Sequence, residues 1–60
     1  MTATIRRDSN GDYVISSRHP HFKAEWGVYN CTDATLYDTM DRMTEWANNE
    51  IFAELLFEIE

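Results

Sequence analysis

The sequence is poor in the residues that usually stabilise a very small protein. Cys31 is the single cysteine among 60 residues, so no disulfide can form within the chain. A metal site does not replace that link, because His19 and His21 flank a proline and have no second pair of ligands near them. We therefore expect residues 1–60 to form one domain that depends on a compact core, or on a partner that completes it.

Long apolar runs are also missing. No stretch approaches the ~18 residues that span a bilayer, and Met1–Arg7 carries charge without the apolar segment of a signal peptide. A lone thiol suits a reducing compartment. These features predict a cytoplasmic protein without a membrane partner.

Residues that would support catalysis are scarce as well. The two glycines, Gly11 and Gly27, are too few for a phosphate-binding loop. The two histidines have no serine or cysteine placed to act as a nucleophile. A sheet of this size with one helix encloses no deep pocket in which a carboxylate pKa could be tuned. The sequence therefore predicts a protein that is not an enzyme and needs no cofactor.

The first half of the chain has the pattern of three strands. Thr2–Arg7 and Asp12–Ser17 flank Asn10-Gly11, a dipeptide typical of tight hairpin turns because both residues tolerate positive φ. A loop containing Pro20 follows. From Phe22 to Tyr29 apolar residues alternate with polar ones, and this period of two predicts a third strand.

The second half has a helical pattern followed by an ambiguous segment. Thr32 is expected to cap a helix that ends at Asn48-Asn49. Its apolar stripe consists of Leu36, Met40, Met43 and Ala47. Residues 50–60 read either as a helix or as a strand that alternates apolar and acidic positions, and the Asn-Asn break favours a strand in the centre of the sheet. The predicted fold is α+β, with the order β-β-β-α-β, an antiparallel sheet and one helix on one face.

Side chains from these elements are expected to share one core. The predicted members are Trp26, Leu36, Met40 and Met43, together with Leu55 or Phe57. Eight aromatic residues exceed what so small a core needs, so Tyr29 or Trp46 is predicted to be an exposed anchor of an interface.

The acidic residues are unevenly distributed, and this carries the functional prediction. Residues 33–60 hold eight acids and one base, Arg42, whereas residues 1–32 hold three acids and four bases. Asp38, Asp41 and Glu45 have the spacing of one helical face, along about 10 Å of helix axis. Glu54 and Glu58 share one face of the last strand. These five residues are the predicted partner-binding site, although a solvated acidic surface that only confers solubility is the alternative.

The acidic charge excludes direct binding of nucleic acid and favours a protein partner with a basic surface. A tiny, acidic, cysteine-poor single domain is similar in overall type to phage-encoded anti-CRISPR proteins, especially inhibitors of type I (Cascade) systems. This resemblance implies a protein of the host-cell cytoplasm that binds a basic, DNA-contacting surface of an effector subunit. It implies blocked DNA binding, by mimicry of DNA phosphates.

Two shorter segments resemble a different family, the HicB-type antitoxin domains. They are the hairpin Asp8-Ser9-Asn10-Gly11-Asp12-Tyr13-Val14 and the turn Cys31-Thr32-Asp33-Ala34-Thr35-Leu36. This resemblance implies a small regulator that binds a toxin, and it is the alternative to the inhibitor. The sequence leaves open whether the protein is a monomer or a homodimer.

Overall fold

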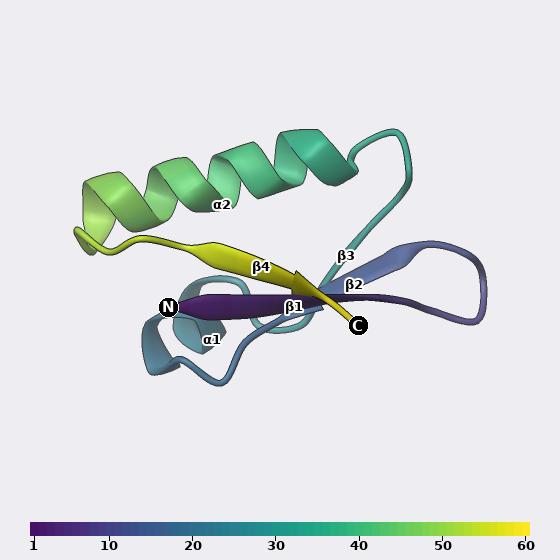
Figure 1. The fold of residues 1–60 in the computed structure, drawn as a ribbon, viewed down its shortest axis with the longest axis horizontal. Coiled ribbons are helices and arrows are strands. Elements are labelled where there is room, and N and C mark those ends of the chain that lie inside the picture. Colours follow the sequence, from purple (N-terminus) through teal and green to yellow (C-terminus); the bar gives the residue numbers. More distant parts are fainter.

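The computed structural model of residues 1–60 is a four-stranded mixed sheet with two helices, which confirms the α+β class (Figure 1). The elements are β1 (Thr2–Arg7), β2 (Tyr13–Ser16), α1 (Pro20–Glu25), β3 (Tyr29–Cys31), α2 (Leu36–Glu50) and β4 (Leu56–Ile59). The strand order is β3-β2-β1-β4, so β1 and β2 are central and β3 and β4 are the two edges.

The predicted hairpin is present. β1 and β2 pair antiparallel, with Ile5 opposite Ile15. In the turn, Gly11 has φ +83°, a conformation that glycine adopts without steric cost. The carboxylate of Asp8 accepts hydrogen bonds from the backbone N–H groups of Asn10 and Asp12, each at 2.9 Å. These bonds lie within the turn, so the local sequence is enough to predict it.

The predicted strand from Phe22 to Tyr29 is wrong. Its first part forms α1, and β3 is only Tyr29–Cys31. Pro20 begins this helix, because its fixed φ suits the first helical position and its missing N–H is not needed there. Phe22 and Trp26 are four residues apart, so the same apolar positions that alternate along a strand also share a helical face. A run this short fits both the period of two that is typical of a strand and the period of about 3.6 that is typical of a helix.

The sheet is not purely antiparallel, because β4 pairs parallel to β1. β3 and β1 both run antiparallel to β2, so they run in the same direction. α2 then carries the chain back along the sheet, and β4 must repeat the direction of β3. The choice of a strand at residues 56–59 is confirmed, but its central position is wrong: β4 lies at an edge.

α2 is shifted relative to the prediction. It begins at Leu36 after the N-cap residue Thr35 and continues through Asn48-Asn49 to Glu50. Thr32 does not cap it. The Thr32 backbone N–H instead donates to the Thr35 hydroxyl at 3.0 Å, closing a short turn before the helix. The hydroxyl of Thr32 also lies 3.1 Å from the Thr35 hydroxyl, so the Thr32 side chain is engaged in this turn and does not cap the helix.

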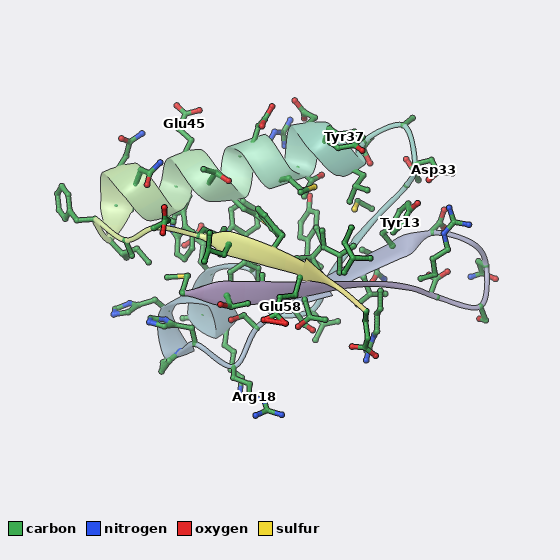
Figure 2. All side chains as sticks on the ribbon, viewed as in Figure 1. Tyr13, Arg18, Asp33, Tyr37, Glu45 and Glu58 are labelled. Carbon is green, nitrogen blue, oxygen red and sulfur yellow. The ribbon has the colours of Figure 1, made fainter.

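The elements form two layers. α2 lies along one face of the sheet, and α1 lies at the end of the sheet where β1 begins (Figure 1). Figure 2 shows Glu45 on the outer side of α2, whereas Arg18 lies on the other side of the sheet. That second face carries a polar groove, and no residue of either helix lines it.

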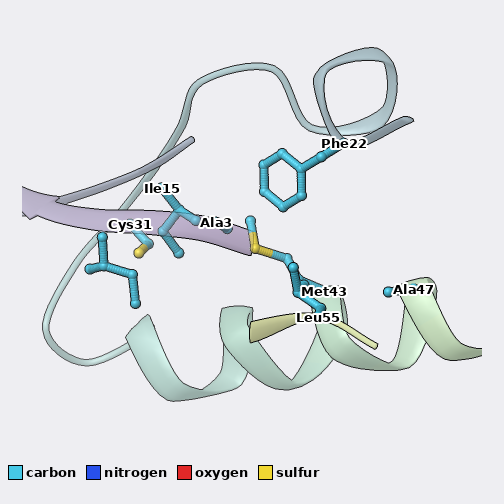
Figure 3. Close-up of a cluster of buried hydrophobic side chains, with 8 residues drawn as sticks. Ala3, Ile15, Phe22, Cys31, Met43, Ala47 and Leu55 are labelled. Carbon is cyan, nitrogen blue, oxygen red and sulfur yellow. The ribbon is translucent and has the colours of Figure 1, made fainter. Parts of the chain in front are cut away.

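The core lies between the sheet and α2 (Figure 3). Its eight buried residues are Ala3, Ile5, Ile15, Phe22, Cys31, Met43, Ala47 and Leu55. Of the predicted core, Met43 and Leu55 are buried, whereas Trp26, Leu36, Met40 and Phe57 are half-buried and pack against it. The prediction identified the inner side of α2 but did not include Phe22, which α1 contributes to the core.

The loss of stability expected from truncating a side chain in the apolar stripe of α2 depends on how deeply that side chain is buried. Met43 is fully buried, so Met43→Ala is expected to lower the free energy of unfolding by about 2–5 kcal/mol. Leu36 is half-buried, so Leu36→Ala should cost roughly half as much. Urea titrations of both variants at one temperature measure the two values. Equal losses, or a larger loss for Leu36→Ala, would contradict this packing.

Candidate functional site

The outer side of α2 carries the first group of predicted site residues. Asp38, Asp41 and Glu45 are all exposed, because the opposite side of the helix buries Thr39, Met43 and Ala47 against the sheet. Asp38 lies in the first turn of the helix, where a carboxylate interacts favourably with the positive end of the helix dipole. The structure thus gathers these three acids on one solvent-facing surface, here called the α2 face.

The charges of the α2 face are only partly compensated. Arg42 Nε lies 3.2 Å from Asp38 Oδ2, and both side chains are well exposed. Asp41 and Glu45 have no ion-pair partner. An exposed i, i+4 pair contributes little stability, but it draws Arg42 towards one end of the face. Uncompensated negative charge therefore concentrates at Asp41 and Glu45.

The second group of predicted site residues lies elsewhere. Glu58 is paired with Thr4 of β1 and lines the groove on the sheet face opposite α2. Glu54 precedes β4 and is exposed. The sheet therefore separates Glu58 from Asp41 and Glu45, and the five predicted residues do not form one continuous surface.

The groove that contains Glu58 has a mixed charge. Its volume is about 810 Å³, and it is lined by Thr2, Thr4, Arg6, Ser16, Ser17, Arg18, His19, Glu58 and Glu60. None of these residues is hydrophobic. Arginines on one side and glutamates on the other leave little net charge, and no buried group in the groove is set up for acid–base chemistry. The groove thus has the composition of a solvated sheet face.

Arg7 makes a contact network that sequence reasoning missed. Its guanidinium donates a hydrogen bond to the Tyr13 hydroxyl at 2.7 Å and lies 4.9 Å from the centre of that ring. Asp33 approaches the same guanidinium at 3.5 Å. The hydrogen bond to Tyr13 and the charge of Asp33 raise the pKa of Arg7. This network ties the loop before α2 to the hairpin, so Asp33 is not a free acid.

The histidines and the cysteine have structural roles. His19 is the N-cap of α1, and its Nδ1 accepts a hydrogen bond from the His21 backbone N–H at 3.3 Å. The rings of His19 and His21 stack with 5.5 Å between centroids. Burial raises the pKa of the Cys31 thiol, which disfavours the reactive thiolate. No three His, Cys, Asp or Glu side chains are grouped to hold a metal ion.

The exposed aromatic and aliphatic side chains differ from those expected. Tyr29 and Trp46 are half-buried in a cluster with Trp26, whose ring stands perpendicular to each of theirs. The exposed large apolar residues are instead Val28, Tyr37, Phe52, Leu56 and Ile59. Tyr37 lies one turn before Asp41 at the border of the α2 face, and its spacing from Asp41 could have identified it.

No protein family, curated protein or solved structure matches the chain. Neither helix has the length and apolarity that crossing a membrane requires.

The environment of Cys31 leads to a chemical prediction. Because its pKa is raised and its side chain is buried, the thiol should react with a disulfide reagent at pH 8 at least about tenfold more slowly than free cysteine. Reaction should accelerate once urea unfolds the protein. Absorbance of the released reporter thiol measures both rates. Rapid reaction of the folded protein would contradict the structural role given to Cys31.

Proposed function

We propose that this protein is a binding protein whose α2 face docks on a basic, nucleic-acid-contacting surface of a partner protein. The observation that carries the proposal is the pair Asp41 and Glu45, exposed on the outer side of a packed helix without a cationic partner. Free carboxylates held on a fixed scaffold attract lysine and arginine side chains and speed association with them.

The spacing of the α2 face supports mimicry of DNA. Asp38, Asp41 and Glu45 distribute three carboxylates over about 10 Å of helix axis. One strand of B-DNA presents a phosphate about every 3.4 Å of axis, so the same length of DNA carries about three phosphates. The three carboxylates follow one another at about 4.5 and 6 Å along the axis, somewhat wider than the phosphates, and the long, flexible lysine and arginine side chains that hold phosphates can reach them. The exposed Tyr37 beside them supplies an aromatic contact of the kind enriched in protein interfaces.

The resemblance to anti-CRISPR proteins indicates which class of basic protein the partner belongs to. In this proposal the protein is a phage-encoded inhibitor that acts in the host cytoplasm. It binds a subunit of a type I (Cascade) effector complex and keeps that complex from its target DNA. The protein itself carries out no chemistry, because inhibition requires only that two acidic ligands compete for one basic surface.

The proposal is tested by inhibition of DNA binding with a panel of purified type I effector complexes. We expect the protein to block the gel shift of a labelled target duplex, and to do so less well as salt rises. In the variant that combines Asp38→Lys, Asp41→Lys and Glu45→Lys, the concentration for half-inhibition should rise by about tenfold or more. Circular dichroism should show that this variant stays folded, because all three side chains face solvent.

A matched pair of single changes controls for net charge. Glu45→Lys and Glu25→Lys each replace an exposed acid on a helix with a base, but only Glu45 lies on the α2 face. Glu45→Lys should weaken inhibition, and Glu25→Lys should not. Unchanged inhibition by the folded triple variant would contradict the role of the α2 face. Failure of the wild-type protein to inhibit any complex in the panel would contradict the CRISPR partner.

A further inference from the structure

One edge of the sheet is open. β4 is hydrogen-bonded to β1 on one side only, since the strand order ends with β4. The Leu56 N–H donates to the Met1 carbonyl and the Glu60 N–H to the Ile5 carbonyl, both at 2.9 Å. In a parallel pair alternate residues turn their amides to opposite sides. The backbone groups of Phe57 and Ile59 therefore point away from β1, towards the free edge.

The side chains of β4 leave this edge accessible. Leu56 is 55% exposed and Ile59 is 84% exposed, and they lie on opposite faces of the strand. β4 contains no proline or lysine, and its one charged residue is the acidic Glu58, which opposes pairing with an acidic strand but not with a basic one. The other edge, β3, is shorter at three residues, and its Cys31 is buried. β4 is thus the edge better suited to accept an added strand.

A second copy of the chain is a poor occupant. Two β4 strands related by a two-fold axis would pair antiparallel, and residues directly opposite each other would share a face of the sheet. If the two-fold axis passes beside any one residue of β4, at least one pair of opposing residues consists of two acids from the set Glu54, Glu58 and Glu60. Like charges directly opposite destabilise a sheet. The acids therefore oppose self-association and favour an occupant of opposite charge.

We propose that the β4 edge binds an extended, basic segment of the partner, which adds a fifth strand to the sheet. This deepens the proposed function and rests on it for the basic character of the partner. The occupant would place lysine or arginine on the groove side, near Glu58 and Glu60. It would place apolar side chains on the α2 side, next to Phe57 and Ile59. Backbone hydrogen bonds supply affinity in such complexes, and alternating side chains supply specificity.

The probe for this proposal is a labelled synthetic peptide of alternating lysine and valine. Fluorescence anisotropy measures its binding, and hydrogen exchange followed by NMR measures the amides of Phe57 and Ile59. We expect both amides to exchange at least about tenfold more slowly when the peptide is bound. A peptide of alternating glutamate and valine should not bind.

Two substitutions at one position separate the backbone edge from side-chain contacts. Ile59→Pro removes an N–H that points away from β1, and proline is tolerated on such edge positions. Ile59→Thr keeps the N–H and removes only apolar surface. Ile59→Pro should weaken peptide binding by about tenfold or more, and Ile59→Thr by much less. Spectra of both free variants should retain the β1–β4 pairing.

Three results would overturn the proposal: no binding of the basic peptide, binding without slowed exchange at Phe57 and Ile59, or unchanged binding by a folded Ile59→Pro variant. Each leaves the role of the α2 face intact, because that role is measured by DNA competition with the triple-lysine variant. Conversely, slowed exchange at the edge together with unchanged inhibition by the triple-lysine variant would support the edge and contradict the α2 face.

Discussion

The parallel pairing of β4 with β1 is the interaction on which the rest of the structure depends. It makes β1 a central strand, so Ala3 and Ile5 are covered on both sides by neighbouring strands and on one face by α2. The pairing continues at its start, where the amino group of Met1 donates to the Glu54 carbonyl at 2.7 Å. A chain of 60 residues without a disulfide has few other ways to hold its last segment. α2 is fixed over the core because both of its ends lead into strands of the same sheet.

The same arrangement distributes the charge. Residues 33–60, which hold most of the acids, form α2 and β4, so the negative charge lies on the outer helix surface and along one sheet edge. The bases Arg6 and Arg18 lie in the groove, and Arg7 is engaged with Tyr13 and Asp33. The sheet therefore keeps two of the five bases, Arg6 and Arg18, away from the α2 face. That separation allows a small protein to present a locally negative surface to a basic partner.

Local patterns predicted the parts of the fold that local chemistry decides. The hairpin follows from Asn10-Gly11, and the apolar stripe of α2 correctly placed Asp41 on the solvent side. The segment from Phe22 to Trp26 could not be assigned by period, because its spacing fits a strand and a helix equally. The direction and edge position of β4 depend on how three strands and a helix are connected, which no short window contains. For the same reason the sequence grouped Glu58 with the helix acids, whereas the fold places it on the opposite face.

The most direct test of the account is hydroxyl-radical footprinting of the protein, free and bound to a type I effector complex. Oxidation is measured at three side chains that are exposed in the free protein. Tyr37 is 75% exposed beside the α2 face, and Ile59 is 84% exposed on the β4 edge. Val28, which is 69% exposed and lies away from both surfaces, is the control. We predict that binding slows oxidation of Tyr37 and Ile59 and leaves Val28 unchanged. Protection of Val28 with unchanged oxidation of Tyr37 would contradict an interface built on the acidic helix.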